Sequence, residues 1–212
     1  MRVVPNLYPA LARQEVVVHS ARHVRTFAEL ADEEVSLTAR AWSERAYAPG
    51  PPYLHAMVNE GRFAGASLAH SHSQLAWFGS PPAAVAVEED AVGEVLAAAP
   101  VVEERDGLAV VAHPAGRVPY ELLLAPPERP AGGAFADERL AGALLLLRDT
   151  IRRLRTVEGP LPWNAWLHDG PWWHLEIVPR LTVLAGLELG AGIHVNVVGP
   201  EDAAATLRAA SG

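Results

Sequence analysis

Two histidines and a glutamine occupy alternating positions in the segment His70-Ser-His72-Ser-Gln74. If this segment forms a β-strand, the two histidines and the glutamine lie on one face and the two serines on the other. One imidazole can then attack phosphorus, its neighbour can orient it, and the amide can hydrogen-bond a phosphoryl oxygen. The same pattern also suits a metal-binding histidine pair or a purely structural strand. The pattern alone therefore leaves three interpretations open.

A glycine-rich turn, Gly61 to Gly65, precedes this segment, with Asn59 before it and Ser67 after it. Backbone N–H groups in such a turn can approach an anion closely. Asparagine and serine are also ordinary turn residues. Phosphate contact and turn formation are thus both open interpretations for Asn59 and Ser67.

The composition excludes several kinds of chemistry. The 212 residues include no cysteine, so a thiol nucleophile, a disulfide and a thiolate metal site are excluded. All 17 basic residues are arginine, which excludes a Schiff-base or P-loop lysine. A net charge of −8 argues against nucleic acid or a membrane surface as partner. With no recognisable signal peptide or spanning segment, we expect a cytoplasmic protein.

Two stretches, beginning at Glu15 and Glu121, share one order of elements: a strand, a loop, a helix of about four turns and two more strands. Short apolar runs predict the first strands, and the matching starts ADEEV and ADERL predict the helices. We interpret this as a duplication, and chance similarity between two α+β stretches is the alternative. The predicted organisation is an N-terminal half, an acidic linker with a connecting helix, and a C-terminal half, at residues 1–82, 83–106 and 107–212.

With these motifs, the chain resembles the galactose-1-phosphate uridylyltransferase family of the histidine-triad superfamily, over nearly its whole length. The family signature H-P-H-x-Q corresponds to His70-Ser-His72-Ser-Gln74, with serine in place of proline. The pattern N-x-G…G-x-S matches Asn59, Gly61, Gly65 and Ser67. Three further family motifs match Asn6-Leu-Tyr8-Pro-Ala-Leu11, Ser20-Ala-Arg-His23 and His174-Leu-Glu176-Ile-Val-Pro179-Arg-Leu181.

The resemblance implies an α+β fold made of two histidine-triad-like halves, with antiparallel sheets and packed helices. It implies that His72 takes a nucleoside monophosphate from a nucleotide sugar and passes it to a phosphate acceptor, a sugar 1-phosphate. His70 and Gln74 would assist, Gln74 by stabilising the nucleotidyl-histidine. The remaining implied roles are phosphate binding by Asn59, Gly65 and Ser67, and lining of the base and ribose pocket by Asn6 and Tyr8. For Tyr8 the alternative is a half-buried core aromatic.

Other functions remain open at this stage. The family's G-Y-E segment is replaced by Gly186-Leu-Glu188, which weakens galactose 1-phosphate as acceptor. The alternatives are a nucleotide-sugar phosphorylase or hydrolase that uses the same histidine, and a nucleotide-binding relative without catalysis. The resemblance also implies a homodimer. The base, the sugar and the acceptor are not specified by the sequence.

Two metal sites of the family have partial counterparts. The structural zinc of the family uses two cysteines and the positions of His23 and His70. We expect this chain to be a short form without that cysteine-bearing region, in which both histidines make hydrogen bonds. A second site corresponds to Glu88, His168 and His174, with Glu176 where a third histidine is common. These donors suit zinc or iron, and a hydrogen-bonded histidine–glutamate pair is the alternative. The remaining histidines are interpreted as structural: His19, His55, His113 and His194.

Overall fold

The computed structural model describes residues 1–83 and 91–210. Its strands are β1 Arg2–Pro5, β2 Gln14–Val18, β3 Tyr53–Glu60, β4 His72–Phe78, β5 Val101–Arg105, β6 Leu108–Ala112, β7 Leu122–Ala125, β8 Trp163–His168 and β9 His174–Pro179. Its α-helices are α1 Asp32–Ala46, α3 Ala91–Ala98, α4 Leu140–Glu158, α5 Gly186–Ala191 and α6 Pro200–Ala209. None of the helices in the described ranges has the length and apolarity needed to cross a bilayer.

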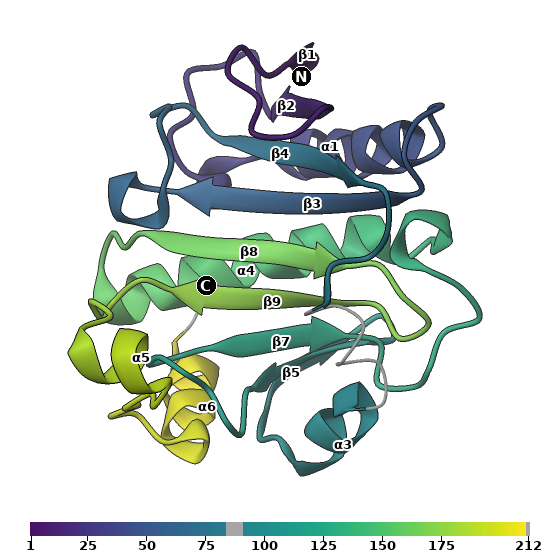
Figure 1. The fold of residues 1–212 in the computed structure, drawn as a ribbon. Coiled ribbons are helices and arrows are strands. Elements are labelled where there is room, and N and C mark those ends of the chain that lie inside the picture. Colours follow the sequence, from purple (N-terminus) through teal and green to yellow (C-terminus); the bar gives the residue numbers. More distant parts are fainter. Residues whose placement is uncertain (84–90, 211–212) are drawn as a thin grey trace.

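All nine strands form one antiparallel sheet in the order β1-β2-β4-β3-β8-β9-β7-β6-β5 (Figure 1). The first half contributes three neighbouring strands in the order β2-β4-β3. The corresponding strands of the second half are β7, β9 and β8, and they follow in the reverse order, β8-β9-β7. The two halves join where β3 pairs with β8. This arrangement agrees with the duplication inferred from the sequence, because the β4 segment and the β9 segment occupy corresponding places.

The main core lies between one face of the sheet and the helices α1 and α4, which are behind the sheet in Figure 1. Alternate strand residues point into this core, including Leu54, Leu75 and Leu167, which are almost fully buried. The apolar stripe of α4 packs against them, as its three-to-four-residue spacing predicts. On the opposite face, α3 covers only the β6–β7 end through a smaller apolar cluster. The middle of that face is left for polar side chains.

The predicted elements are confirmed with two shifts. Helix α1 begins at Asp32, and the acidic side chains in its first turn favour the helix dipole. The expected linker contains α3 and also β5, an edge strand that the sequence interpretation did not separate. Strand β4 begins at His72, so His70 lies in the bend before the strand. The expectation that His70 shares a strand face with His72 is therefore wrong.

Candidate active site

His72 is the first residue of β4 and is only 4% exposed. Its Nδ1 lies 2.8 Å from the backbone oxygen of His70. A carbonyl can only accept, so Nδ1 carries the proton and donates to it. The neutral ring then has its lone pair on Nε2, and among the described residues the structure gives Nε2 no hydrogen-bond partner. The backbone thus selects the tautomer in which Nε2 is able to act as a nucleophile.

The side chain of His70 contacts backbone oxygens beside the bend that contains this carbonyl. Its Nε2 lies 2.9 Å from the backbone oxygen of Arg22, and its Nδ1 lies 3.1 Å from that of Ser71. The ring of His23 stands edge-on to the ring of His70, with centroids 6.0 Å apart. A backbone oxygen only accepts, so a neutral His70 donates to one of these two oxygens at a time, which agrees with a hydrogen-bonding role.

Two asparagines continue from His72 across the sheet. The pairing of Val58 with Ser73 sets Asn59 beside His72, and Asn59 in turn pairs with Asn164 on β8. The amide of Asn164 donates to Oδ1 of Asn59 at 2.7 Å and to the backbone oxygen of Ala64 at 2.8 Å. Asn59 therefore belongs to a hydrogen-bond network beside His72. The sequence interpretation missed Asn164, because only the pairing of the two halves brings it there.

Gln74 follows His72 on the same face of β4. Its Oε1 accepts a hydrogen bond of 2.6 Å from the amide of Gln14 on β2. Because this bond occupies the oxygen, the NH₂ group of Gln74 is the end available to an incoming anion. Gln14 was not singled out from the sequence, since nothing local shows that β2 lies next to β4.

A cleft of about 810 Å³ opens at the end of the sheet where β3 ends and β4 begins. His70, His72, Asn59 and Ser67 line this cleft. Three arginines also line it, Arg25, Arg62 and Arg155, together with the carboxyl groups of Glu29 and Glu60.

The glycine-rich turn beside the cleft does not offer its amides as expected. The N–H groups of Ala64 and Ala66 both donate to the backbone oxygen of Gly61, at 3.0 and 3.2 Å. The N–H of Gly65 donates to the backbone oxygen of Arg62 at 3.0 Å. Gly65 has a φ of +85°, which glycine adopts without strain. Its observed role is to close the turn and bring Ser67 to the cleft.

Asn6 and Tyr8 lie in the loop between β1 and β2 and do not line the cleft. The loop is tied to Gln14, whose backbone oxygen accepts from Asn6 N at 2.9 Å and whose side chain accepts from Ala10 N. Since Gln14 also holds Gln74, the loop borders the site through that side chain. Tyr8 is 86% exposed, so the alternative of a core aromatic is wrong.

The second half places His168, His174 and Glu176 on the same open face. Their ligand atoms all lie within 4.8 Å of one another, and all three side chains are buried. Nε2 of His168 is 2.7 Å from Oε1 of Glu176, and the two imidazoles stack with centroids 4.5 Å apart. Two imidazoles and a carboxylate fit zinc or iron, and the cluster equally forms the expected histidine–glutamate pair. Glu88 lies outside the described residues.

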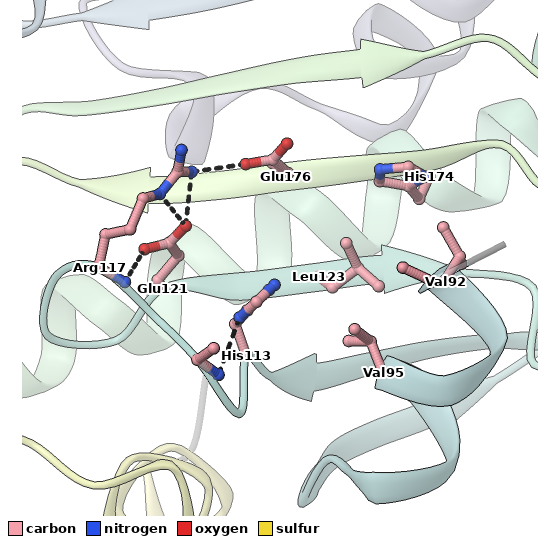
Figure 2. A pocket seen from close by; sticks show the side chains of 10 residues that line it. Val92, Val95, His113, Arg117, Glu121, Leu123, His174 and Glu176 are labelled. Carbon is pink, nitrogen blue, oxygen red and sulfur yellow. Dashed lines mark hydrogen bonds and ion pairs between the residues drawn. The ribbon is translucent and has the colours of Figure 1, made fainter. Parts of the chain in front are cut away.

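Arg117 supports this cluster from the loop before β7 (Figure 2). Its guanidinium contacts Oε2 of Glu176 at 2.7 Å and Oε1 of Glu121 at 2.6 Å. Burial alone would raise the pKa of Glu176, but the hydrogen bond to His168 and the charge of Arg117 outweigh it and lower that pKa to about 2. Glu176 is therefore held as a carboxylate.

Comparison with known proteins agrees with this geometry. The family model for the N-terminal domain of galactose-1-phosphate uridyl transferase matches residues 9–80. ADP-glucose phosphorylase from Arabidopsis thaliana is 26% identical and is matched by the whole chain over 74% of its own length. Galactose-1-phosphate uridylyltransferase from Streptomyces lividans is 30% identical over 82% of this chain. The chain spans 58% of that relative.

The solved structures give the same result over the full fold. A structure of the Arabidopsis thaliana ADP-glucose phosphorylase with bound ADP-glucose superposes with a TM-score of 0.86 at 26% identity, covering 98% of this chain and 81% of that one. Residues 9–80 of this chain match the N-terminal domain of galactose-1-phosphate uridyl transferase, and the whole fold is similar to that of the ADP-glucose phosphorylase. The matched region includes β4, which begins at His72, the second histidine of the signature.

Proposed function

We propose that this protein is a nucleotidyltransferase that moves a nucleoside monophosphate from a nucleotide sugar to a phosphate acceptor through a nucleotidyl-His72 intermediate. The hydrogen bond from Nδ1 of His72 to the His70 carbonyl carries this proposal, because it leaves Nε2 as a lone-pair donor at the wall of a cleft. Similarity to a uridylyltransferase and to an ADP-glucose phosphorylase supports it.

In the first step, Nε2 of His72 attacks the α-phosphorus of the nucleotide sugar. A P–N bond forms while the bond from that phosphorus to the bridging oxygen breaks, and the sugar 1-phosphate leaves with that electron pair. The proton on Nδ1 stays in its bond to the His70 carbonyl, which stabilises the positive charge that develops on the ring. Negative charge on the phosphoryl oxygens would face the amide of Asn59 in the cleft, and Gln74, further along the same face of β4, would stabilise the nucleotidyl-histidine.

In the second step, a phosphate oxygen of the acceptor attacks the same phosphorus, the P–N bond breaks, and His72 regains its lone pair. Arg25, Arg62 and Arg155 line the cleft and would attract both the leaving and the incoming phosphate. Ser67 would contact a phosphoryl oxygen, while Asn6 and the exposed Tyr8 would border the nucleoside from the β1–β2 loop.

Intact-mass spectrometry tests the covalent step. The protein is incubated with a panel of UDP-, ADP- and GDP-sugars without acceptor, and a mass gain of one nucleoside monophosphate is expected. His72→Ala removes the nucleophile and should abolish the gain. His113→Ala is the control, because His113 is a half-buried histidine that lies in the pocket of Figure 2, away from the cleft. A gain that persists in His72→Ala would refute the proposal.

A phosphorylase is the second candidate, favoured by one observation. The relative matched by the whole chain is an ADP-glucose phosphorylase. Both activities use the same intermediate and differ only in the acceptor, so the acceptor decides between them. Turnover with inorganic phosphate would identify a phosphorylase, and turnover without acceptor a hydrolase. Nucleotide binding by calorimetry without any adduct would identify the non-catalytic relative.

We further propose that His168, His174 and Glu176 hold one divalent metal, zinc or iron. A metal bound there would crosslink β8 and β9 next to the active face, and no step of the transfer is assigned to it. Arg117 would orient Glu176 from outside the ligand set. Elemental analysis should find metal in the wild type and lose it in His174→Ala. Equal metal content in both would refute the site.

We also propose a homodimer. Exposed apolar side chains gather in the segment after β9, and a second copy would cover them: Leu181, Val183, Leu187, Leu189, Ile193, Val195 and Val197. Light scattering should give twice the chain mass, and Leu189→Glu should shift it towards the monomer. A wild-type monomer at all concentrations would refute the dimer. The cytoplasmic location stays a prediction.

A further inference from the structure

His19, the residue after β2, is a fully buried histidine that the proposed transfer does not use. Its Nε2 has no hydrogen-bond partner within the described part of the chain, although the ring is buried against Phe27. A buried imidazole with one nitrogen unsatisfied costs stability relative to an apolar ring of similar size. Such a group requires an explanation beyond packing.

The other nitrogen of His19 provides the explanation. Nδ1 lies 2.9 Å from Oγ of Ser71, and the backbone N–H of His19 donates to the backbone oxygen of Ser71 at 3.2 Å. The N–H of Ser71 donates to the backbone oxygen of Val24 at 2.8 Å. Ser71 is 4% exposed and is thus held through its side chain, its carbonyl and its amide.

Ser71 controls the group that orients the nucleophile. The peptide unit that joins His70 to Ser71 offers its N–H to Val24 and its carbonyl to Nδ1 of His72. Fixing Ser71 therefore fixes the plane of this peptide and the direction of the carbonyl. In the family signature this position is proline, whose ring restricts the backbone dihedral directly. Serine lacks that restriction, and hydrogen bonds take its place.

We infer that His19 is a positioning residue for His72: by holding Ser71, it aims the His70 carbonyl that selects the reactive tautomer of the nucleophile. This inference rests on the proposed function for its effect on rate, but its effect on the tautomer does not. The neutral state of His19 agrees with it, since burial, together with the neighbouring imidazoles of His72 and His70, lowers the pKa of His19 to about 3.

The test compares three variants of the full chain with the wild type. His19→Phe keeps the ring volume and removes both nitrogens, and Ser71→Ala removes only Oγ. His19→Asn places an amide nitrogen near the position of Nδ1 and should restore the bond to Ser71. Long-range ¹H–¹⁵N spectra report which nitrogen of His72 carries the proton, with His72→Ala used to assign the signals. Thermal unfolding confirms that each variant is folded.

We expect a single Nδ1-protonated tautomer of His72 in the wild type and a mixture in His19→Phe and Ser71→Ala. Adduct formation should slow about tenfold in both, with the KM for the donor unchanged, and His19→Asn should recover most of the rate. Wild-type tautomer and rate in both variants would overturn the inference. If the wild type forms no adduct, the proposed function fails, and the tautomer alone decides the role of His19.

Discussion

Replacing His19 by phenylalanine should make the protein less sensitive to acid. The folded protein keeps the imidazole neutral, with a pKa of about 3, whereas the unfolded chain protonates it with the ordinary pKa of 6.5. Below pH 6.5 the unfolded state therefore binds a proton that the folded state does not. Stability is lost from this group as the pH falls from 6.5 towards 3, and His19→Phe removes that loss.

The magnitude follows from the two pKa values. One pH unit in this interval is worth about 1.4 kcal/mol for a single group. At pH 5, which is 1.5 units below the pKa in the unfolded chain, the wild type should have lost about 2 kcal/mol through His19 alone. Because His19 is fully buried, solvent screening does not reduce this figure substantially.

Urea unfolding followed by tryptophan fluorescence measures the effect, since the chain has six tryptophans. The free energy of unfolding is determined at pH 8 and pH 5 for both proteins, and the two differences are compared. All other titrating groups are common to both, so they cancel. His19→Phe should lose about 2 kcal/mol less than the wild type between these pH values. An equal loss in both proteins would show that His19 is not held neutral by burial.

Three further outcomes are expected. Asn164→Ala should lower kcat about tenfold or more, because it removes the hydrogen bond that holds Asn59, and it should change the melting temperature little. A wild-type kcat in steady-state kinetics would contradict the role of this network. Asp137→Asn should cost roughly 2 kcal/mol at neutral pH. Burial opposes the shift, but bonds from Arg139 outweigh it and lower the pKa of Asp137 to about 2. This stability is present above pH 3.8 and is lost as the pH falls through 2. In urea unfolding, the difference in free energy of unfolding between the wild type and Asp137→Asn should therefore be smaller at pH 2.5 than at pH 7. An equal difference at both pH values would contradict this role of Asp137. Gly61→Ala should destabilise the fold by about 1–3 kcal/mol, because the φ of Gly61 is +85° and the new methyl group would lie 2.9 Å from Cβ of Pro162. An unchanged melting temperature would exclude that strain.

The sequence predicted most elements because their signals are local. The apolar periodicity of α4 and the short runs of β2 and β7 depend only on neighbouring residues. His72 could be proposed as the nucleophile for the same reason, since its motif lies within one segment. Its position as the first residue of β4 could not be predicted in this way, because the strand begins where Ser71 is held by His19 and Val24.

The missed residues depend on contacts between distant segments. Asn164 joins the site through the pairing of β8 with β3, and Gln14 joins it through the side chain of Gln74. His19 was interpreted as structural, because its partner Ser71 lies 52 positions further along the chain. Nothing in the composition of either segment specifies such a pairing.

The junction between β3 and β8 has a consequence for synthesis of the chain. Asn59 on β3 pairs with Asn164 on β8, so the edge of β3 that faces β8 stays unpaired until residues 105 positions later have been synthesised. At ribosomal speeds of about 5–20 residues per second, this edge stays unpaired for roughly 5–20 seconds. An unpaired strand edge is a template for pairing with another chain. The N-terminal half is therefore most exposed to aggregation before β8 emerges, and fragments that end before Trp163 should self-associate.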